Sequence, residues 1–163
     1  MKTSAYQAFV ESSKLEVAIQ KALKKAGIQP GAANNPLALQ EASTTIRNAF
    51  SSHSLPPGLA EGLCMAYRDL GMPAVAVRSS ATAEDLPEMS FAGQQDTFLN
   101  ILGEEALLEA VVSCWSSLWT ARAIGYRARN SIPQDTVALA VVVQQMVQAA
   151  AAGVLFTAHP LTG

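Results

Sequence analysis

The segment at 136–147 constrains the fold of this chain more than any other. It reads TVALAVVVQQMV, and its first residues are continuously apolar and rich in β-branched side chains. Such a run is typical of a strand that is covered on both faces. Apolar residues make up 50% of the 163 residues and charged residues 15%, which is enough apolar surface to build a core around such a strand. We therefore expect a sheet layered with helices.

Helical and strand-like patterns occupy different parts of the chain. Residues 1–72 carry apolar side chains at helical spacing, interrupted by segments rich in Gly, Asn and Pro. From Pro73 onward, strand-like segments at 74–77, 95–102, 136–147 and 153–158 alternate with helical segments at 104–119 and 121–130. This order predicts an α+β fold with α/β layering.

The two later helical segments contain both tryptophans of the chain and three of its arginines. Trp115 and Trp119 recur on one helical stripe, which predicts that both lie in the core. Arg122, Arg127 and Arg129 follow in the next segment, and we expect them to form a solvated face.

A polar cluster follows the predicted strand at 74–77. Arg78 comes directly after this strand, together with hydroxyl side chains, and Gly93 lies further along in SFAGQQ. A guanidinium offers a planar set of donors that suits phosphate oxygens, and a glycine lets the backbone approach a ligand closely. The cluster therefore suggests an anion site. The alternative is structural: Arg78 pairs with Glu84 or Asp85 and fixes a long loop.

A pair of glutamines interrupts the apolar run at 141–148. Gln144 and Gln145 are followed by Met146, whose thioether packs readily against flat groups. One interpretation is a hinge where the backbone meets a planar heterocycle. The other is a strand that passes from the core to the surface.

Charge and cysteine content exclude several classes of protein. The formal net charge is −2, without a basic arm, which argues against a nucleic-acid-binding protein. The sequence contains no run of 18 apolar residues, so we expect no membrane-spanning helix. Cys64 and Cys114 stand far apart without metal-ligand spacing, so we expect buried free thiols and a cytoplasmic setting.

Three motifs together resemble a known family. They are RSSATAEDLPEMSFAGQQDTFLN (78–100), VVVQQMV (141–147) and GVLFTAHPLTG (153–163). In wording and spacing they are similar to the ATP-binding domain of phosphoenolpyruvate synthases, pyruvate phosphate dikinases and rifampin phosphotransferases. The resemblance covers residues 3–163, is loose before Pro73 and is tight from Ala74 onward.

The resemblance implies an ATP-grasp-like fold, in which two lobes clamp ATP. It implies a first lobe at 1–143, helical over 1–72 and mixed over 73–143, and an interlobe strand with the start of an incomplete second lobe at 144–163. It also implies that Arg78 contacts phosphates and acts in catalysis. Gly93, Gln94 and Thr97 would cover the phosphate chain, and the adenine would lie against Gln144, Gln145 and Met146.

The resemblance further implies the chemistry of a longer protein. Members cleave ATP with Mg²⁺ and pass a phosphoryl group to a histidine on a swivelling domain, then to pyruvate or an antibiotic hydroxyl. The phosphate-binding lysine, the acidic magnesium ligands and the phosphohistidine domain of the family have no match here, so no metal ligand is assigned to this chain. We expect a fragment that binds ATP weakly and is inactive alone.

Two further expectations concern the isolated chain. An alternative function is a non-catalytic nucleotide-binding or interaction module that reuses this lobe. The apolar segment at 153–158, predicted as a strand, would leave an unpaired edge, and we expect this edge to cause self-association or partner docking.

Overall fold

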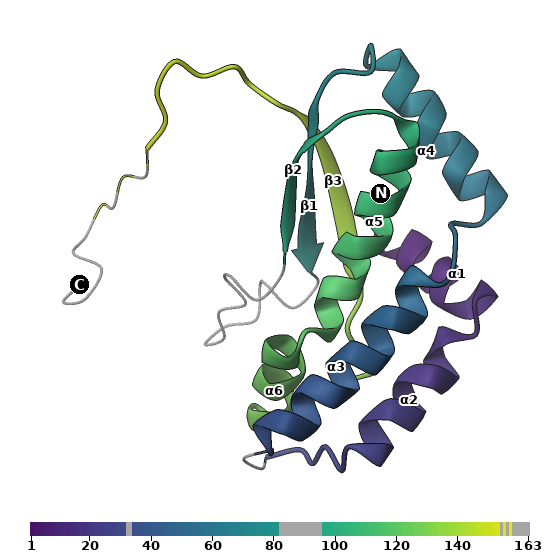
Figure 1. The fold of residues 1–163 in the computed structure, drawn as a ribbon, viewed down its shortest axis with the longest axis vertical. Helices are drawn as coiled ribbons and strands as arrows, with labels where there is room; N and C mark the ends of the chain where they lie inside the picture. The colour runs from purple at the N-terminus through teal and green to yellow at the C-terminus, as the bar shows by residue number, and fades with distance from the viewer. Residues whose placement is uncertain (32–33, 82–95, 154, 156, 158–163) are drawn as a thin grey trace.

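The computed structural model describes residues 1–31, 34–81, 96–153, 155 and 157. Within these residues, helices pack on a small antiparallel sheet (Figure 1), which confirms the predicted α+β class. The helices are α1 (Thr3–Ser12), α2 (Leu15–Lys25), α3 (Pro36–Ser51), α4 (Pro57–Asp69), α5 (Glu104–Ser116) and α6 (Ala121–Arg129), with a 3₁₀ turn η1 at Ser117–Trp119. The strands are β1 (Val75–Ala81), β2 (Thr97–Ile101) and β3 (Leu139–Gln145).

Local sequence signals explain where the first helices begin and which face they bury. α3 starts at Pro36, and the side chain of Asn35 accepts a hydrogen bond from the Leu37 amide at 2.9 Å. Proline suits this first helical position because its missing N–H would have no partner there. In α2 the predicted stripe is confirmed, since all its members are buried: Leu15, Ile19, Ala22 and Leu23.

The core lies between the sheet and the helices. Val75 and Val77 of β1 are fully buried against a helical layer that includes α5. An aromatic group joins α1 to α5, with the rings of Phe9 and Trp115 5.2 Å apart. Trp119 is also buried and donates to the Tyr6 hydroxyl at 3.1 Å, so the predicted core positions of both tryptophans are confirmed.

The sheet has the strand order β2-β1-β3, and both pairings are antiparallel. Only one face of β3 is covered: Val141 is buried, whereas Val142 is 48% exposed. The prediction of a strand covered on both faces is therefore wrong. The reason is that no described helix lies over the outer face, so apolar residues there face the surface.

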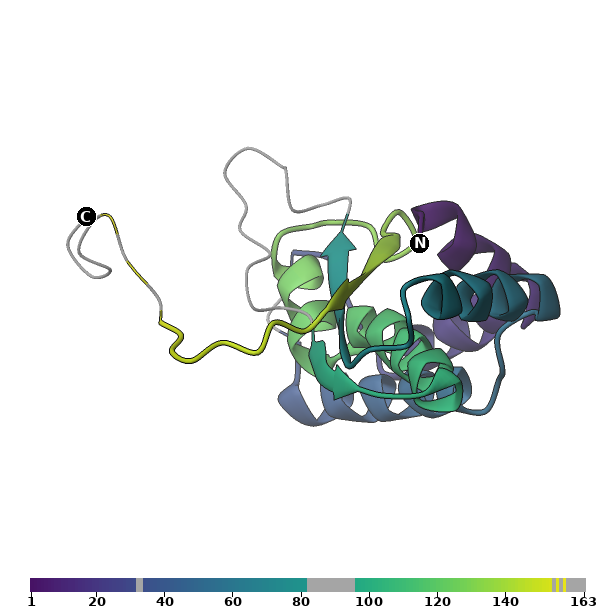
Figure 2. The same cartoon turned by 90° about the horizontal axis from the view of Figure 1, so that it is seen from above.

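The chain leaves the sheet after β3. In Figures 1 and 2, residues 147–153 run away from the helical layer. Gly153, Leu155 and Thr157 are the described residues of the segment predicted as a strand at 153–158, and none of them is in a strand. No neighbouring strand in the described part of the chain offers them backbone partners, and the other residues of the segment lie outside it.

Candidate functional site

An open groove lies on the uncovered face of the sheet. Its volume is about 370 Å³. All three strands contribute to it, and the last two residues come from the segment after β3; the lining residues are Ala76, Arg78, Thr97, Leu99, Gln144, Gln145, Met146 and Val147. Five of the seven site residues predicted from the sequence therefore line one surface.

Strand pairing explains why these distant residues meet. Arg78 in the central strand lies opposite Thr97 of β2 and opposite Val142 of β3. Ala76, two residues earlier, lies opposite Gln144. Because side chains alternate between the faces of a strand, Ala76 and Arg78 lie on the face opposite to Val75 and Val77. Ala76 is buried on that face, whereas Arg78 is exposed.

The guanidinium of Arg78 is exposed and only lightly engaged. Its Nη1 donates to the Gln144 Oε1 at 3.4 Å. Among the described residues, the ion pairs involve Arg47, Arg68 and Arg122, and none involves Arg78. Since most of its donors are free of carboxylates in this part of the chain, Arg78 can offer them to an anion in the groove. Glu84 and Asp85, its alternative partners, lie outside the described residues.

Part of the backbone of the predicted hinge already forms a hydrogen bond within the sheet. The amide of Met146 donates to the Ala74 carbonyl at 2.9 Å, which continues the pairing of β3 with the start of β1. A planar heterocycle at this position would therefore meet the Met146 side chain and not its amide. Gln144 and Gln145 are exposed, as expected for a strand that passes to the surface.

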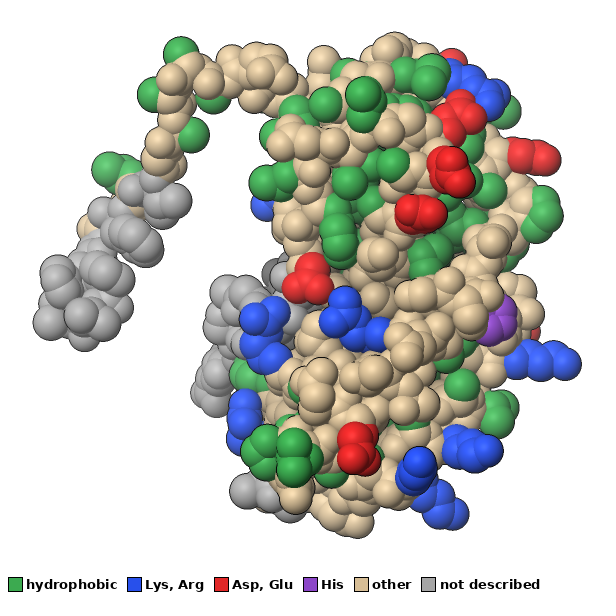
Figure 3. All heavy atoms as spheres, viewed as in Figure 1, with side chains coloured by type: hydrophobic (Ala, Val, Ile, Leu, Met, Phe, Trp, Pro, Cys, Tyr) green, Lys and Arg blue, Asp and Glu red, His purple; other side chains and the backbone are tan. Residues whose placement is uncertain are grey.

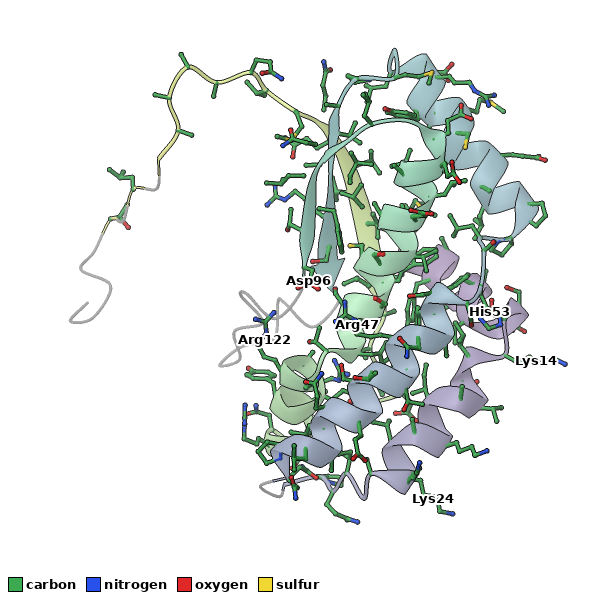
Figure 4. All side chains as sticks on the ribbon, viewed as in Figure 1. Lys14, Lys24, Arg47, His53, Asp96 and Arg122 are labelled. Carbon is green, nitrogen blue, oxygen red and sulfur yellow. The ribbon has the colours of Figure 1, made fainter. Side chains whose placement is uncertain are left out.

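A cluster of charges supports the start of β2 beside the groove. The Asp96 carboxylate lies 3.9 Å from a guanidinium nitrogen of Arg47 in α3, and 3.9 Å from one of Arg122 in α6 (Figure 4). These contacts tie the residue before Thr97 to two helices. All three side chains are more than a third exposed, so solvent screens the attraction.

Two predicted site residues cannot be placed. Gly93 and Gln94 lie outside the described residues, so their roles stay predictions. Conversely, the groove is also lined by three residues that were not predicted from the sequence: Ala76, Leu99 and Val147. The alternation of side chains would have found Ala76, since it stands two positions before Arg78 on the same strand.

A larger cavity lies elsewhere among the described residues and has the wrong charge for a phosphate site. Its volume is about 790 Å³, and it lies between α4, α5 and the segment after α3. Glu104, Glu105 and Glu109 line it, and Figure 3 shows acidic side chains gathered over this part of the surface. Carboxylates repel phosphate oxygens, so size alone does not identify the anion site.

Neither cysteine has the chemistry of a nucleophile. Burial raises the pKa of the Cys114 thiol to about 12. Burial, followed by the nearby Glu104 carboxylate, also raises the pKa of Cys64. Both thiols therefore stay protonated at neutral pH, which confirms the expectation of buried free thiols. Among the described residues, no three His, Cys, Asp or Glu side chains gather as a metal site requires.

One arginine that we expected in solvent is buried. Arg127 is 1% exposed; its Nε donates to the Gln134 Oε1 at 2.7 Å, and its guanidinium lies 5.1 Å from the Trp119 ring centroid. The prediction of a solvated Arg127 is wrong because α6 turns this position toward the core, and only Arg122 and Arg129 face solvent. Burial lowers the Arg127 pKa to about 10, so the group remains charged at neutral pH.

No helix in the described part of the chain is long and apolar enough to cross a bilayer.

Comparison with known proteins identifies a matching family. Residues 1–163 match the family described as "Pyruvate phosphate dikinase, AMP/ATP-binding domain". The chain is 45% identical over 167 aligned residues to a phosphoenolpyruvate synthase of Aeropyrum pernix, an alignment that covers 99% of this chain and 20% of that protein. It is 48% identical over 130 residues to a phosphoenolpyruvate synthase of Pyrococcus furiosus, covering 76% of the chain and 16% of the relative.

A relative named for a different activity matches at similar identity. A rifampicin phosphotransferase of Streptomyces sviceus is 51% identical over 127 residues, which is 77% of this chain and 15% of that protein. The chain therefore spans about a fifth or less of the length of these relatives.

Proposed function

The chain belongs to the family of pyruvate phosphate dikinase AMP/ATP-binding domains, and we propose that it contributes one wall of an ATP site in an ATP-dependent phosphotransferase. One observation carries the proposal. Arg78, Thr97 and Gln144 come from three different strands, yet they border one open groove that is free of described acidic side chains. This arrangement supports a site for a negatively charged ligand with a flat, polar end group.

Each residue of the groove has a role that follows from its chemistry. Arg78 holds phosphate oxygens, because its fork donates two parallel hydrogen bonds to one anion and stabilises charge that moves during phosphoryl transfer. Thr97, its cross-strand neighbour, adds a hydroxyl donor. Gln144 and Gln145 bind polar edges of the adenine, and the Met146 side chain packs on its face.

The remaining family features complete the proposal. We place ATP between two lobes of an ATP-grasp fold, with residues 1–143 in the first lobe and 144–163 at the start of the second. Gly93 and Gln94 cover the phosphates. Mg²⁺ neutralises the phosphate charge when bound, and its acidic ligands are expected outside this chain.

The proposed reaction of the whole protein needs more than this domain. We propose that ATP is cleaved to AMP and phosphate: the β-phosphoryl group leaves AMP and moves to a histidine of a swivelling domain, water takes the γ-phosphoryl group, and the histidine passes its phosphoryl group to pyruvate or to a hydroxyl of another small molecule. The names of the relatives, phosphoenolpyruvate synthase and rifampicin phosphotransferase, support both acceptors. We also propose a cytoplasmic location, where ATP is available.

Replacement of Arg78 tests the proposed site. In the complete gene product, we expect Arg78→Ala to weaken MgATP binding roughly 10- to 100-fold, because a hydrogen bond between charged groups contributes about 1.5–3 kcal/mol. Arg78→Lys should lose nearly as much, since an ammonium cannot replace the fork. Isothermal titration calorimetry measures both.

The matched control is Arg129→Ala, which removes an exposed arginine of α6 outside the groove. Its affinity for MgATP should equal that of the unmodified protein. Equal affinity in Arg78→Ala would contradict the proposed site, whereas ATP binding without phosphoryl transfer in the unmodified protein would favour a non-catalytic nucleotide-binding module.

A further inference from the structure

Strand β2 contains an irregularity next to the groove. Val75 pairs with Ile101 and Val77 pairs with Phe98. Between these two pairs β1 has one residue, Ala76, whereas β2 has two, Leu99 and Asn100. One extra residue on one strand is the definition of a β-bulge.

The bulge is located at Asn100. This residue has a φ of +57°, in the left-handed region that most residues avoid. Asparagine tolerates this conformation better than other non-glycine residues, and β-branched residues tolerate it worst. Asn100 is therefore suited to a bulge position, where β2 contains one residue more than β1.

The bulge reverses the face on which the first half of β2 points. Phe98 and Ile101 both pack against the core, although they stand three positions apart. In a regular strand such residues lie on opposite faces, because side chains alternate. Asn100 thus allows Phe98 to point inward and Thr97 to point outward, beside Arg78.

A regular strand would give the opposite result with little loss of apolar burial. If Ile101 kept its place opposite Val75, Leu99 would lie opposite Val77 and Thr97 opposite Ser79, on the covered side. Leu99 would then be buried in place of Phe98, and both are large apolar side chains. Since burial does not strongly favour one register, the conformation of residue 100 decides between them.

We propose that Asn100 is a positioning residue: its left-handed bulge places the Thr97 hydroxyl in the groove beside Arg78. This inference concerns strand geometry, and its consequence for ATP rests on the function proposed above. Asn100 itself needs no contact with the ligand. A residue that disfavours the left-handed region removes Thr97 from the groove, and glycine at position 100 keeps it there.

Thiol labelling tests the geometry without ATP. The two native cysteines are buried, so a cysteine introduced at position 97 is the exposed thiol that a maleimide reaches first. In Thr97→Cys, and in Thr97→Cys with Asn100→Gly, we expect rapid labelling. In Thr97→Cys combined with Asn100→Val, we expect labelling to be roughly tenfold slower or more, since buried thiols react slowly.

Val142→Cys supplies the control, because it lies on the same face of the sheet in β3. Its labelling rate should not depend on residue 100. Equal labelling of position 97 in the Asn100→Val and Asn100→Gly backgrounds overturns the inference. If Asn100→Val unfolds, the native thiols react as well, and Asn100→Ala replaces it with the same expected direction of change.

MgATP affinity of the complete gene product separates the two proposals. Asn100→Val should weaken MgATP binding as much as Thr97→Val does. Asn100→Gly should keep the affinity of the unmodified protein. If labelling responds to residue 100 while affinity does not, Asn100 still sets the direction of Thr97, but the proposed contact of Thr97 with ATP is wrong.

Discussion

The two faces of the sheet are built from the same three strands but serve different ends. On the inner face, Val75 and Val77 are fully buried against helices. On the outer face, Arg78 and Thr97 border an open groove with no described helix above it. Neighbouring residues therefore have different roles: Val77 stabilises the fold, and Arg78 is exposed and can contact a ligand.

The difference shows how a small domain can expose a groove lined by polar side chains without destabilising its core. Alternation along a strand separates the two sets of side chains at every step. Substitutions on one face should therefore change stability, and substitutions on the other should change ligand binding.

The largest expected effect comes from placing a carboxylate on each face. Val77→Asp should destabilise the chain by about 4 kcal/mol or more, because it buries a charge without a partner. Val142 is the cross-strand neighbour of Arg78 and is 48% exposed. Val142→Asp should therefore lower the free energy of unfolding by less than about 1 kcal/mol. Urea unfolding measures both, and similar losses would show that the outer face is covered.

Arg78 and Arg127 provide a second test of how exposed and buried positions differ, because Arg78 is exposed and Arg127 is buried. Gln134→Leu removes the acceptor of the Arg127 Nε and should cost about 2 kcal/mol, because a buried guanidinium then loses a hydrogen bond. Gln134→Glu keeps an acceptor for the Arg127 Nε and adds a counter-charge, so it should cost less than Gln134→Leu, although both variants lose the hydrogen bond that the Gln134 Nε2 donates to the Ile124 carbonyl. Arg78→Ala should change the free energy of unfolding by less than about 0.5 kcal/mol. Equal stability of the two Gln134 variants would contradict this account of Arg127.

A smaller effect is expected in the pH dependence of stability, and it comes from buried side chains only. Burial raises the pKa of Cys114 from 9.0 to about 12 and that of Tyr6 from 10.0 to about 12. Between the unfolded and folded pKa values, the unfolded chain binds fewer protons, so stability falls as pH rises. From pH 8 to pH 10 we expect a loss of about 1–2 kcal/mol, since each titrating group contributes up to about 1.4 kcal/mol per pH unit.

Cys114→Ala should remove the larger part of this pH dependence, because its thiol begins to ionise at lower pH than the Tyr6 hydroxyl in the unfolded chain. The measurement is the free energy of unfolding in urea at pH 8, 9 and 10. An unchanged slope in this variant would mean that the Cys114 thiol is accessible to solvent.

A small effect is expected at the border between the two faces. Asp96→Asn removes the attraction to Arg47 and Arg122 but should cost less than about 1 kcal/mol, because all three side chains are partly exposed and the distances are 3.9 Å. High salt should reduce even this difference. A larger loss that persists in 1 M salt would show that Asp96 supports β2 through contacts other than charge.

Much of the fold could be predicted from local patterns. The helices in residues 1–72, the strand at 74–77 and the helix from Glu104 follow from apolar spacing and from Pro and Gly punctuation. Arg78, Thr97 and Gln144 were selected from their residue types and from the family resemblance, and strand pairing brings them to one groove. The helices and the strand could be predicted because they depend on neighbours within a few positions, whereas the roles of the three site residues stay predictions.

Other features depended on what packs against what. The exposure of Val142 and the burial of Arg127 both contradict expectations from composition, since neither periodicity nor charge specifies which neighbour covers a position. Residue types and their spacing were enough to predict most of the helices and strands and the chemistry of the polar cluster. They were not enough to predict which face of the sheet stays open or on which face Thr97 lies, because burial, strand register and one left-handed residue are set jointly by contacts between distant segments.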